Sequence, residues 1–277
     1  MRYTTNDTSI KILDKHEFNP KQILECGQVF RYRKTDEGYE VYSLDKCAKI
    51  VEKNDYYLIY TSDVKYFEKY FDLRTDYKQI KQALYKHKCL QDAIVYGSGI
   101  RLLRQDIFET IVSFIISANN NIPRIQGSIE KLCTNFGSKK DGYFAFPTLA
   151  QLSKASVQDL KDAGLGYRAE QLKKTLEMLK FINLEQIRTY TYTGKKKFLI
   201  SLAGVGEKVA DCILLFAFNE MGAFPVDTWI AKSYKQIFNS DETNRTKMRE
   251  NLYEMFGEYS GYAQQYIFYY YRDNKLG

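Results

Sequence analysis

Lys208 and Asp227 are the two residues whose types and surroundings could carry out covalent chemistry. Lys208 follows the turn Gly204-Val-Gly206 and precedes apolar residues at helical spacing, which places it in the first turn of a predicted helix. The positive end of the helix dipole disfavours an ammonium ion there, so we expect the pKa of Lys208 to be lowered. A neutral amine is a nucleophile that forms an iminium with an aldehydic or glycosidic carbon.

Asp227 offers the negative charge that such a reaction needs. It lies nineteen residues after Lys208 (227 minus 208) and follows Pro225, in a segment typical of another helix start. Each residue also has a plainer interpretation, because a lysine here commonly contacts a phosphate and an aspartate here commonly caps its helix. The spacing alone leaves both interpretations open.

The glycines Gly204 and Gly206 predict a helix-hairpin-helix over about residues 196–219. They let the backbone approach a ligand closely, and the first amides of the second helix can face a phosphate. The run Lys195-Lys196-Lys197 would add positive charge that releases counterions from DNA. The segment is either a clamp for the DNA backbone or an ordinary helix turn, since the pattern G-x-G is common.

Composition narrows the class of protein. The chain has 277 residues, enough for two domains of about 150 residues each. No run reaches the roughly 18 apolar residues of a membrane span, and the N-terminal segment lacks a secretory signal, so we expect a cytoplasmic protein, nucleoid-associated if bacterial. The net charge of +7 is a modest excess that favours an anionic partner.

The metal-ligating residue types are too scattered to predict a metal site. The five cysteines include no C-x-x-C pair: Cys26, Cys47, Cys89, Cys133 and Cys212. The two histidines, His16 and His87, lie far apart. We therefore expect no catalytic metal and no cofactor, and chemistry that rests on lysine, aspartate or cysteine.

Two periodicities divide the chain and indicate an α+β fold. Residues 28–62 alternate β-branched and aromatic residues with turn residues, which predicts an antiparallel meander. Later apolar residues recur at helical spacing, for example from Leu103 to Ile115, before the run Asn119-Asn120-Asn121. We expect an N-terminal antiparallel β domain with flanking helices over residues 1–95 and a mainly α-helical helix-hairpin-helix core over residues 96–277.

One further helix start is visible in the sequence. Ser156 and Asp159 have the spacing of a capping box, which predicts a short helix that Gly164 ends.

Motifs in a fixed order give the chain a resemblance to a known family. They are CGQVFRY at Cys26–Tyr32, ISANNNIPRI at Ile116–Ile125, GLGYRA at Gly164–Ala169, GVGEKVAD with the later PVD at Gly204–Asp211 and Pro225–Asp227, and AQQYIF at Ala263–Phe268. Together they resemble the 8-oxoguanine DNA glycosylases of the bifunctional glycosylase/lyase type, within the helix-hairpin-helix superfamily. The resemblance spans about residues 20–272 and is far more specific than the hairpin alone.

The resemblance implies base excision repair of duplex DNA that contains 8-oxoguanine, with the damaged nucleotide flipped out of the helix. It implies that Lys208 attacks C1′, expels the base and leaves a Schiff base that undergoes β-elimination. Asp227 would stabilise the developing positive charge.

The resemblance also implies a pocket for the flipped base. The carbonyl of Gly27 would accept the hydrogen at N7, which guanine lacks, so that guanine would leave a buried mismatch of about 1–3 kcal/mol. Cys212 and Phe268 would enclose the base on its two faces, and Gln264 would bond its Watson–Crick edge. Gln264 and Phe268 are four residues apart, as are Lys208 and Cys212, so each pair shares a helix face.

The implied contacts with the rest of the duplex come from the other motifs. Asn119 would fill the gap left by the base, Arg124 and Tyr167 would contact an opposite cytosine, and Arg168 would lie near the partner strand. One residue departs from the family pattern: Trp229 stands where a histidine that contacts a phosphate is common.

The hairpin adds two further implied contacts. Gly204 and Gly206 would contact the DNA backbone, and the main-chain carbonyls of Ile200, Leu202 and Val205 would form a site for a cation. We expect no membrane partner and a monomer.

Two other functions remain open on the sequence. A related helix-hairpin-helix glycosylase for other oxidised bases is one, although endonuclease III-like enzymes carry a four-cysteine cluster and this chain has no cysteine after Cys212. A non-catalytic helix-hairpin-helix protein that only grips duplex DNA is the other.

Overall fold

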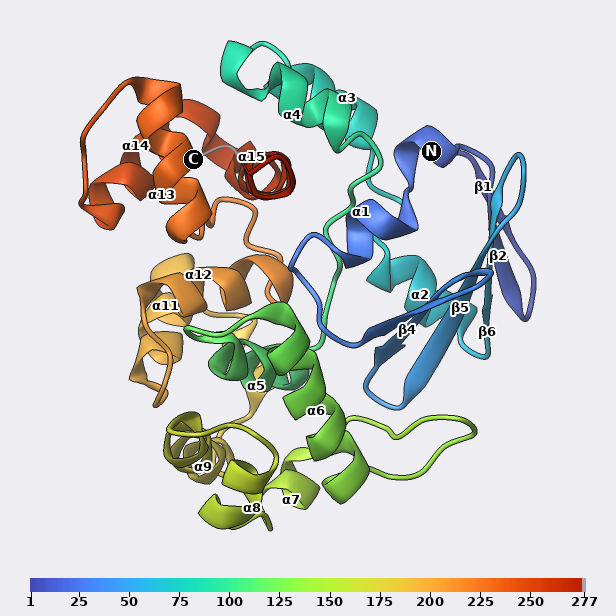
Figure 1. Cartoon of the computed structure of the whole chain (residues 1–277), viewed down its shortest axis with the longest axis vertical. Helices are drawn as coiled ribbons and strands as arrows, with labels where there is room; N and C mark the ends of the chain where they lie inside the picture. Colours follow the sequence, from blue (N-terminus) through green and yellow to red (C-terminus); the bar gives the residue numbers. More distant parts are fainter. Residues whose placement is uncertain (276–277) are drawn as a thin grey trace.

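A six-stranded antiparallel sheet occupies the N-terminal part of the chain, with strand order β1-β2-β6-β5-β4-β3 (Figure 1). The structure is a computed structural model and describes residues 1–275. The strands are β1 (Tyr3–Thr5), β2 (Ser9–Ile12), β3 (Tyr32–Thr35), β4 (Gly38–Ser43), β5 (Lys46–Glu52) and β6 (Tyr57–Thr61). The predicted meander is confirmed as β3 to β6, whereas the hairpin of β1 and β2 was not predicted.

One face of the sheet is apolar because the strand register lines up its aliphatic side chains. Ile59 pairs with Ile10 on one side and with Ile50 on the other, and all three side chains are buried. Helices α1 (Pro20–Leu24) and α2 (Val64–Tyr70) contribute to the same apolar cluster.

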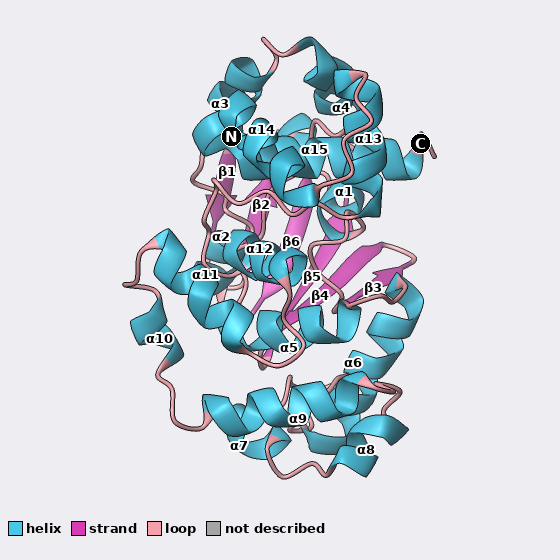
Figure 2. Ribbon diagram, turned by 90° about the vertical axis from the view of Figure 1, so that its left-hand side faces the viewer, coloured by secondary structure: helices cyan, strands magenta, loops and turns pink. Residues whose placement is uncertain are grey.

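The rest of the chain is helical, which confirms the predicted fold class. The α-helices are α3 (Tyr77–Leu84), α4 (Gln91–Tyr96), α5 (Ile107–Ser117), α6 (Ile122–Phe136), α7 (Leu149–Leu152), α8 (Val157–Asp162), α9 (Arg168–Leu179), α10 (Leu184–Ile187), α11 (Tyr192–Ser201), α12 (Glu207–Phe216), α13 (Thr228–Phe238), α14 (Arg245–Phe256) and α15 (Ser260–Asp273). Short 3-10 turns are η1 (Lys15–Glu17), η2 (Lys88–Leu90) and η3 (Gly257–Tyr259). In Figures 1 and 2, α12 lies between the group α13–α15 and the group α7–α9.

Helix starts follow the sequence signals. The capping box of Ser156 and Asp159 opens α8, as predicted, and Gly164 follows with a positive φ of 93°. Asn121 accepts a hydrogen bond from the Arg124 amide and begins α6. Asn119, between α5 and α6, has a φ of 49°, a conformation that asparagine tolerates better than most residues.

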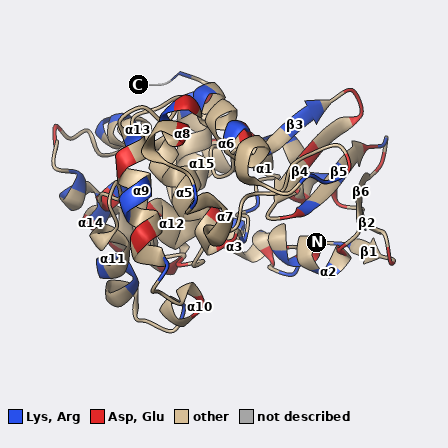
Figure 3. Ribbon diagram, turned by 90° about the horizontal axis from the view of Figure 1, so that it is seen from below, with Lys and Arg blue, Asp and Glu red and all other residues tan. Residues whose placement is uncertain are grey.

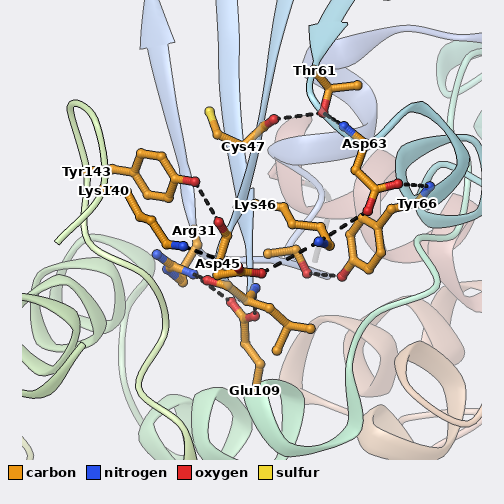
Figure 4. A network of polar contacts seen from close by, with 12 residues as sticks. Arg31, Asp45, Lys46, Cys47, Thr61, Asp63, Tyr66, Glu109, Lys140 and Tyr143 are labelled. Atoms are coloured by element: carbon orange, nitrogen blue, oxygen red, sulfur yellow. Dashed lines mark hydrogen bonds and ion pairs between the residues drawn. The ribbon is translucent and has the colours of Figure 1, made fainter. Parts of the chain in front are cut away.

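A buried ion pair joins the sheet to the helical part (Figure 4). Arg31 Nη1 lies 3.3 Å from Glu109 Oε1 on α5, and Arg31 Nη2 donates to the Phe144 carbonyl at 2.8 Å. The other Glu109 oxygen accepts from the Leu44 amide at 2.7 Å, in the turn between β4 and β5. Burial raises the pKa of Glu109 despite the neighbouring Arg31 guanidinium.

The segment between the sheet and α5 also packs on the C-terminal helices. Tyr77 on α3 and Tyr262 on α15 meet edge to face, with ring centroids 5.4 Å apart and an interplanar angle of 90°. Ile94 on α4 belongs to the same apolar core as Tyr266 and Ile267 on α15. The domain boundary near residue 95 stays a prediction. Within the described residues, none of the helices is long and apolar enough to cross a membrane.

Candidate active site

The hairpin places Lys208 where the sequence predicted it. Helices α11 and α12 are joined by a turn in which Gly204 has a φ of 84°, a left-handed conformation that suits glycine. Gly206 precedes α12 in extended conformation, and Lys208 is the second residue of that helix. The side chain of Lys208 thus starts from the first turn and reaches into the interior.

Lys208 and Asp227 line one small cavity of about 40 Å³, which we call the Lys208 pocket. Its walls come from the loop after α1, from α5, α12 and α15, and from the segment before α13. The lining residues are Cys26, Gly27, Phe114, Lys208, Cys212, Phe216, Pro225, Asp227, Gln264, Gln265 and Phe268. The structure therefore brings together both predicted catalytic residues and all predicted base-contacting residues, which lie up to 241 positions apart (268 minus 27).

The protonation of Lys208 differs from the expectation. Burial lowers the pKa of its amine, but the neighbouring Cys212 and Asp227 outweigh burial, so the pKa lies above the ordinary value of 10.5. The prediction of a lowered pKa, based on the helix dipole alone, was wrong because it omitted these two neighbours. The amine also lies 5.7 Å from the centroid of the Phe114 ring, which favours the ammonium form further.

Asp227 is both a helix cap and a pocket residue. Its Oδ1 accepts a hydrogen bond of 2.9 Å from the Ile230 amide and thereby begins α13. Burial raises the pKa of the carboxyl above its ordinary value, while the backbone hydrogen bonds and Lys208 act against that rise. The two interpretations left open by the sequence are therefore compatible, since the cap fixes the carboxylate beside the amine.

The loop at Gly27 and helix α15 form the opposite walls of the pocket. Gly27 has a φ of 81°, and a Cβ atom there would lie 3.1 Å from Phe268 Cε1, so this position suits glycine on two grounds. Gln265 Nε2 donates to the Cys26 carbonyl at 2.7 Å. Gln264 is 5% exposed, and its buried Oε1 has no hydrogen-bond partner within residues 1–275. A buried acceptor left open in a cavity is suited to a ligand donor.

The residues predicted to meet the opposite strand divide into exposed and buried. Asn119 and Arg124 are exposed, and Tyr167 is 56% exposed. Arg168 is buried, and its guanidinium donates to the carbonyls of Ala118 and Asn119 at 2.7 Å each. The contacts of Arg168 in the structure are thus internal, and they support the turn that carries Asn119.

The lysine run before the hairpin contributes less free charge than we expected. Lys195 is buried and pairs with Glu220 at 2.6 Å. Lys196 lies 2.8 Å from the buried Asp211 on α12, so it fastens α11 to α12. Only Lys197 of the run is exposed. Figure 3 shows basic and acidic residues interspersed over the helices, in keeping with the modest net charge.

The remaining predicted contacts lie on or near the hairpin. Trp229 is partly buried in the first turn of α13, and the Lys232 amine lies 5.1 Å from the centroid of its ring. The Ile200 side chain is exposed to solvent. The Leu202 carbonyl accepts a hydrogen bond of 3.1 Å from the Val205 amide. A cation held by these carbonyls stays a prediction. Within residues 1–275, no cluster of histidine, cysteine or acidic residues is arranged to hold a metal ion.

Several pocket residues were not predicted. Phe114 lies on the apolar face of α5 and packs against Phe30 and Phe216, with ring centroids 5.4 and 5.6 Å away. Nothing in the sequence distinguishes it from other core residues on that helix, because its role follows from a contact with a distant segment. Cys26 and Gln265 flank predicted pocket residues, and adjacency was the only available signal.

The hairpin that presents Lys208 and the capping Asp227 in the same pocket form the arrangement that the resemblance implied for base excision glycosylases. Residues 112–258 match the family described as "HhH-GPD superfamily base excision DNA repair protein". Residues 11–111 match the family described as "8-oxoguanine DNA glycosylase, N-terminal domain". The chain therefore belongs to the 8-oxoguanine DNA glycosylase family and is a DNA glycosylase/AP lyase.

Individual relatives agree with this assignment. An N-glycosylase/DNA lyase of Saccharomyces cerevisiae is 32% identical in an alignment 241 positions long that covers 72% of this chain and 64% of the yeast protein. The 8-oxoguanine glycosylase/lyase of Clostridium acetobutylicum, solved with double-stranded DNA containing cytosine opposite 8-oxoguanine, is 35% identical, with a TM-score of 0.94 over 100% of this chain and 99% of that one. An endonuclease III–DNA complex, at 16% identity and a TM-score of 0.53 over 69% of this chain and 86% of that one, shares the fold alone.

Proposed function

We propose that the protein excises 8-oxoguanine, preferentially opposite cytosine, from duplex DNA and then cleaves the strand by β-elimination. The observation that carries the proposal is the Lys208 pocket, in which an amine and a carboxylate meet the glycine carbonyl, glutamine and aromatic ring that suit an oxidised purine. The similar glycosylase/lyase of Clostridium acetobutylicum, solved with DNA that contains 8-oxoguanine, supports the same substrate.

The chemistry begins with deprotonation of Lys208. The free amine attacks C1′ of the flipped nucleotide, and the bond from C1′ to N9 breaks with its electron pair leaving on the base, which takes up a proton. The Asp227 carboxylate stabilises the positive charge that develops on the sugar. Ring opening gives a Schiff base between Nζ and C1′, and loss of a proton from C2′ expels the 3′-phosphate by β-elimination.

Selection of the base rests on the Gly27 carbonyl. 8-Oxoguanine carries a hydrogen on N7 that this carbonyl can accept, whereas guanine presents a lone pair that would leave both acceptors buried and unpaired. Gln264 offers its open Oε1 to the Watson–Crick edge, and Phe268 and Cys212 cover the two faces. A cavity of about 40 Å³ holds a water molecule but no purine, so the walls must separate when the base enters.

Reduction with borohydride in the presence of an 8-oxoguanine duplex tests the proposal. The Schiff base is reduced to a stable amine, so the wild-type chain should become covalently attached to the DNA. The Lys208→Gln variant should lose this attachment while it keeps affinity for the duplex, and Lys65→Gln, which removes an exposed lysine from α2, should behave as the wild type.

The alternatives give different results. Attachment to duplexes with other oxidised bases but not to the 8-oxoguanine duplex would assign the site to another lesion. No attachment to any damaged duplex, with binding retained, would leave a protein that only grips DNA or a glycosylase that uses Asp227 without a Schiff base.

A further inference from the structure

We propose that Arg272 is a positioning residue that fixes the Phe268 ring relative to the loop Glu25–Gly27, which we call the Gly27 loop. It thereby sets the selectivity of the Lys208 pocket for its base. This inference rests on the proposed function and deepens it, because Arg272 does not itself line the pocket. It lies one helical turn beyond Phe268 on α15.

The contacts of Arg272 reach both walls. Its Nη2 donates to the Glu25 carbonyl at 2.8 Å, at the end of α1. The guanidinium carbon lies 5.2 Å from the centroid of the Phe268 ring and 5.6 Å from that of Tyr269, so the cation covers aromatic surface on α15. Asp273 fixes the guanidinium from another side, through Oδ1 at 2.7 Å from Nη2.

Helix α15 thus secures consecutive carbonyls of the loop. Gln265 binds the Cys26 carbonyl and Arg272 binds the Glu25 carbonyl. The next carbonyl, that of Gly27, accepts no hydrogen bond from residues 1–275. Because the two preceding peptide groups are held, the direction of the Gly27 carbonyl is restricted, as its proposed role in reading N7 requires.

The same guanidinium also contacts the Phe268 ring, the pocket wall that faces Gly27. The Gly27 backbone and the Phe268 ring are in close contact, since an added Cβ on Gly27 would lie 3.1 Å from that ring. A base that enters the pocket must part them, and Arg272 is bonded to one side and stacked on the other. Its Nη1 is buried, lacks a hydrogen-bond partner within residues 1–275, and lies 3.6 Å from where that Cβ would be. One donor is therefore free to bond the loop as the pocket widens.

The proposed role of Arg272 concerns recognition of the base and not the reaction of Lys208 with the sugar. Cleavage at a preformed abasic site needs Lys208 but places no base against Gly27 or Phe268. A residue that acts only on base selection should therefore affect excision of 8-oxoguanine and leave cleavage of abasic DNA intact.

The test measures three rates on the full chain: single-turnover excision of 8-oxoguanine opposite cytosine, excision of guanine in the same duplex, and cleavage at an abasic site. For Arg272→Met, which keeps an apolar stem over Phe268 but loses the guanidinium, we expect excision of 8-oxoguanine to fall about tenfold or more, the equivalent of about 1.4 kcal/mol. The ratio of 8-oxoguanine excision to guanine excision should fall as well, while the rate of abasic cleavage stays within about twofold of the wild type. Arg74→Met, the same substitution at an exposed arginine in the turn after α2, should leave all three rates unchanged.

Arg272→Lys keeps the charge and a donor for the Glu25 carbonyl but has no plane to stack, so its excision rate should lie between those of Arg272→Met and the wild type. This variant also serves if Arg272→Met does not fold, which the loss of a cooperative thermal transition would indicate.

Two results would overturn the inference. One is an equal loss of 8-oxoguanine excision and abasic cleavage, which would make Arg272 a general support of the fold; the other is full excision and selectivity in both variants. Failure of the proposed function looks different, because the wild-type chain itself would then leave the 8-oxoguanine duplex intact.

Discussion

At the scale of single residues, the surroundings of Lys208 stabilise its protonated amine, whereas the attack on C1′ needs the neutral amine. Cys212 is buried one helical turn along α12, and burial raises the pKa of its thiol to about 11. Among the groups that raise the pKa of Lys208, Cys212 is the largest and Asp227 the next. The pocket thus keeps a protonated amine in the free enzyme, and the attack on C1′ requires that proton to be lost first.

A Cys212→Ala variant tests this account of the lysine. Abasic cleavage should rise with pH as Lys208 loses its proton, and removal of Cys212 lowers the pKa of Lys208, so the midpoint of the rise should move to lower pH. The measurement is the pH dependence of single-turnover cleavage of abasic DNA, a substrate that places no base against position 212. Cys133→Ala, which removes a buried thiol from α6, should leave the midpoint in place. A midpoint that stays or moves upward in Cys212→Ala would contradict the account.

The sequence predicted which residues line the pocket better than it predicted their protonation. Motif order was enough to bring Lys208, Asp227 and Gln264 to one site, because motif residues retain their roles across a family. The protonation of Lys208 was mispredicted, since it depends on a balance of burial and neighbouring charges that only the folded chain defines. Phe114 and Arg272 escaped prediction because each acts through a contact between segments far apart in the chain.

At the scale of elements, the Arg31–Glu109 pair fastens the sheet to α5, the helix that carries Phe114 beneath Lys208. The Arg31 side chain is 2% exposed and that of Glu109 11%, so removal of Glu109 takes away the nearest carboxylate of a buried guanidinium. Arg31 would then keep only the Phe144 carbonyl and the carboxylate of Glu130, which lies 3.8 Å away and is more exposed. Periodicity predicted both the meander and α5, but it could not predict the ion pair between Arg31 and Glu109. A polar residue on an apolar helix face gives no indication of which distant residue will be its partner.

The Glu109→Ala variant should therefore lose about 3–5 kcal/mol of unfolding free energy, the usual effect of breaking a buried pair. Denaturant unfolding measures it. Asp45→Ala, which breaks the exposed contact with Lys140 in the same network (Figure 4), should cost less than about 1 kcal/mol. Equal losses in the two variants would mean that the buried pair contributes no more than the exposed one.

At the scale of the whole molecule, the pocket and the predicted contacts with the opposite base lie on different groups of helices. The pocket lies where α12 meets α15 and the loop after α1, whereas Arg124 begins α6 and Tyr167 immediately precedes α9. Arg168 joins the start of α9 to the turn between α5 and α6 through the Ala118 and Asn119 carbonyls. We therefore expect selection of the damaged base and selection of its partner to be separable by substitution.

This separation predicts the behaviour of an Arg124→Ala variant. If Arg124 donates hydrogen bonds to an opposite cytosine, its loss should reduce excision opposite cytosine by about tenfold, within the range of about 1–3 kcal/mol for such a contact, and change excision opposite the other bases little. Single-turnover rates on duplexes with 8-oxoguanine opposite each of the four bases measure this directly. Lys131→Ala, which removes an exposed cation about two helical turns further along α6, provides the matched control, with unchanged rates on all four duplexes. A uniform loss in Arg124→Ala would instead indicate a contact with the phosphate backbone, because such a contact carries no information about the base.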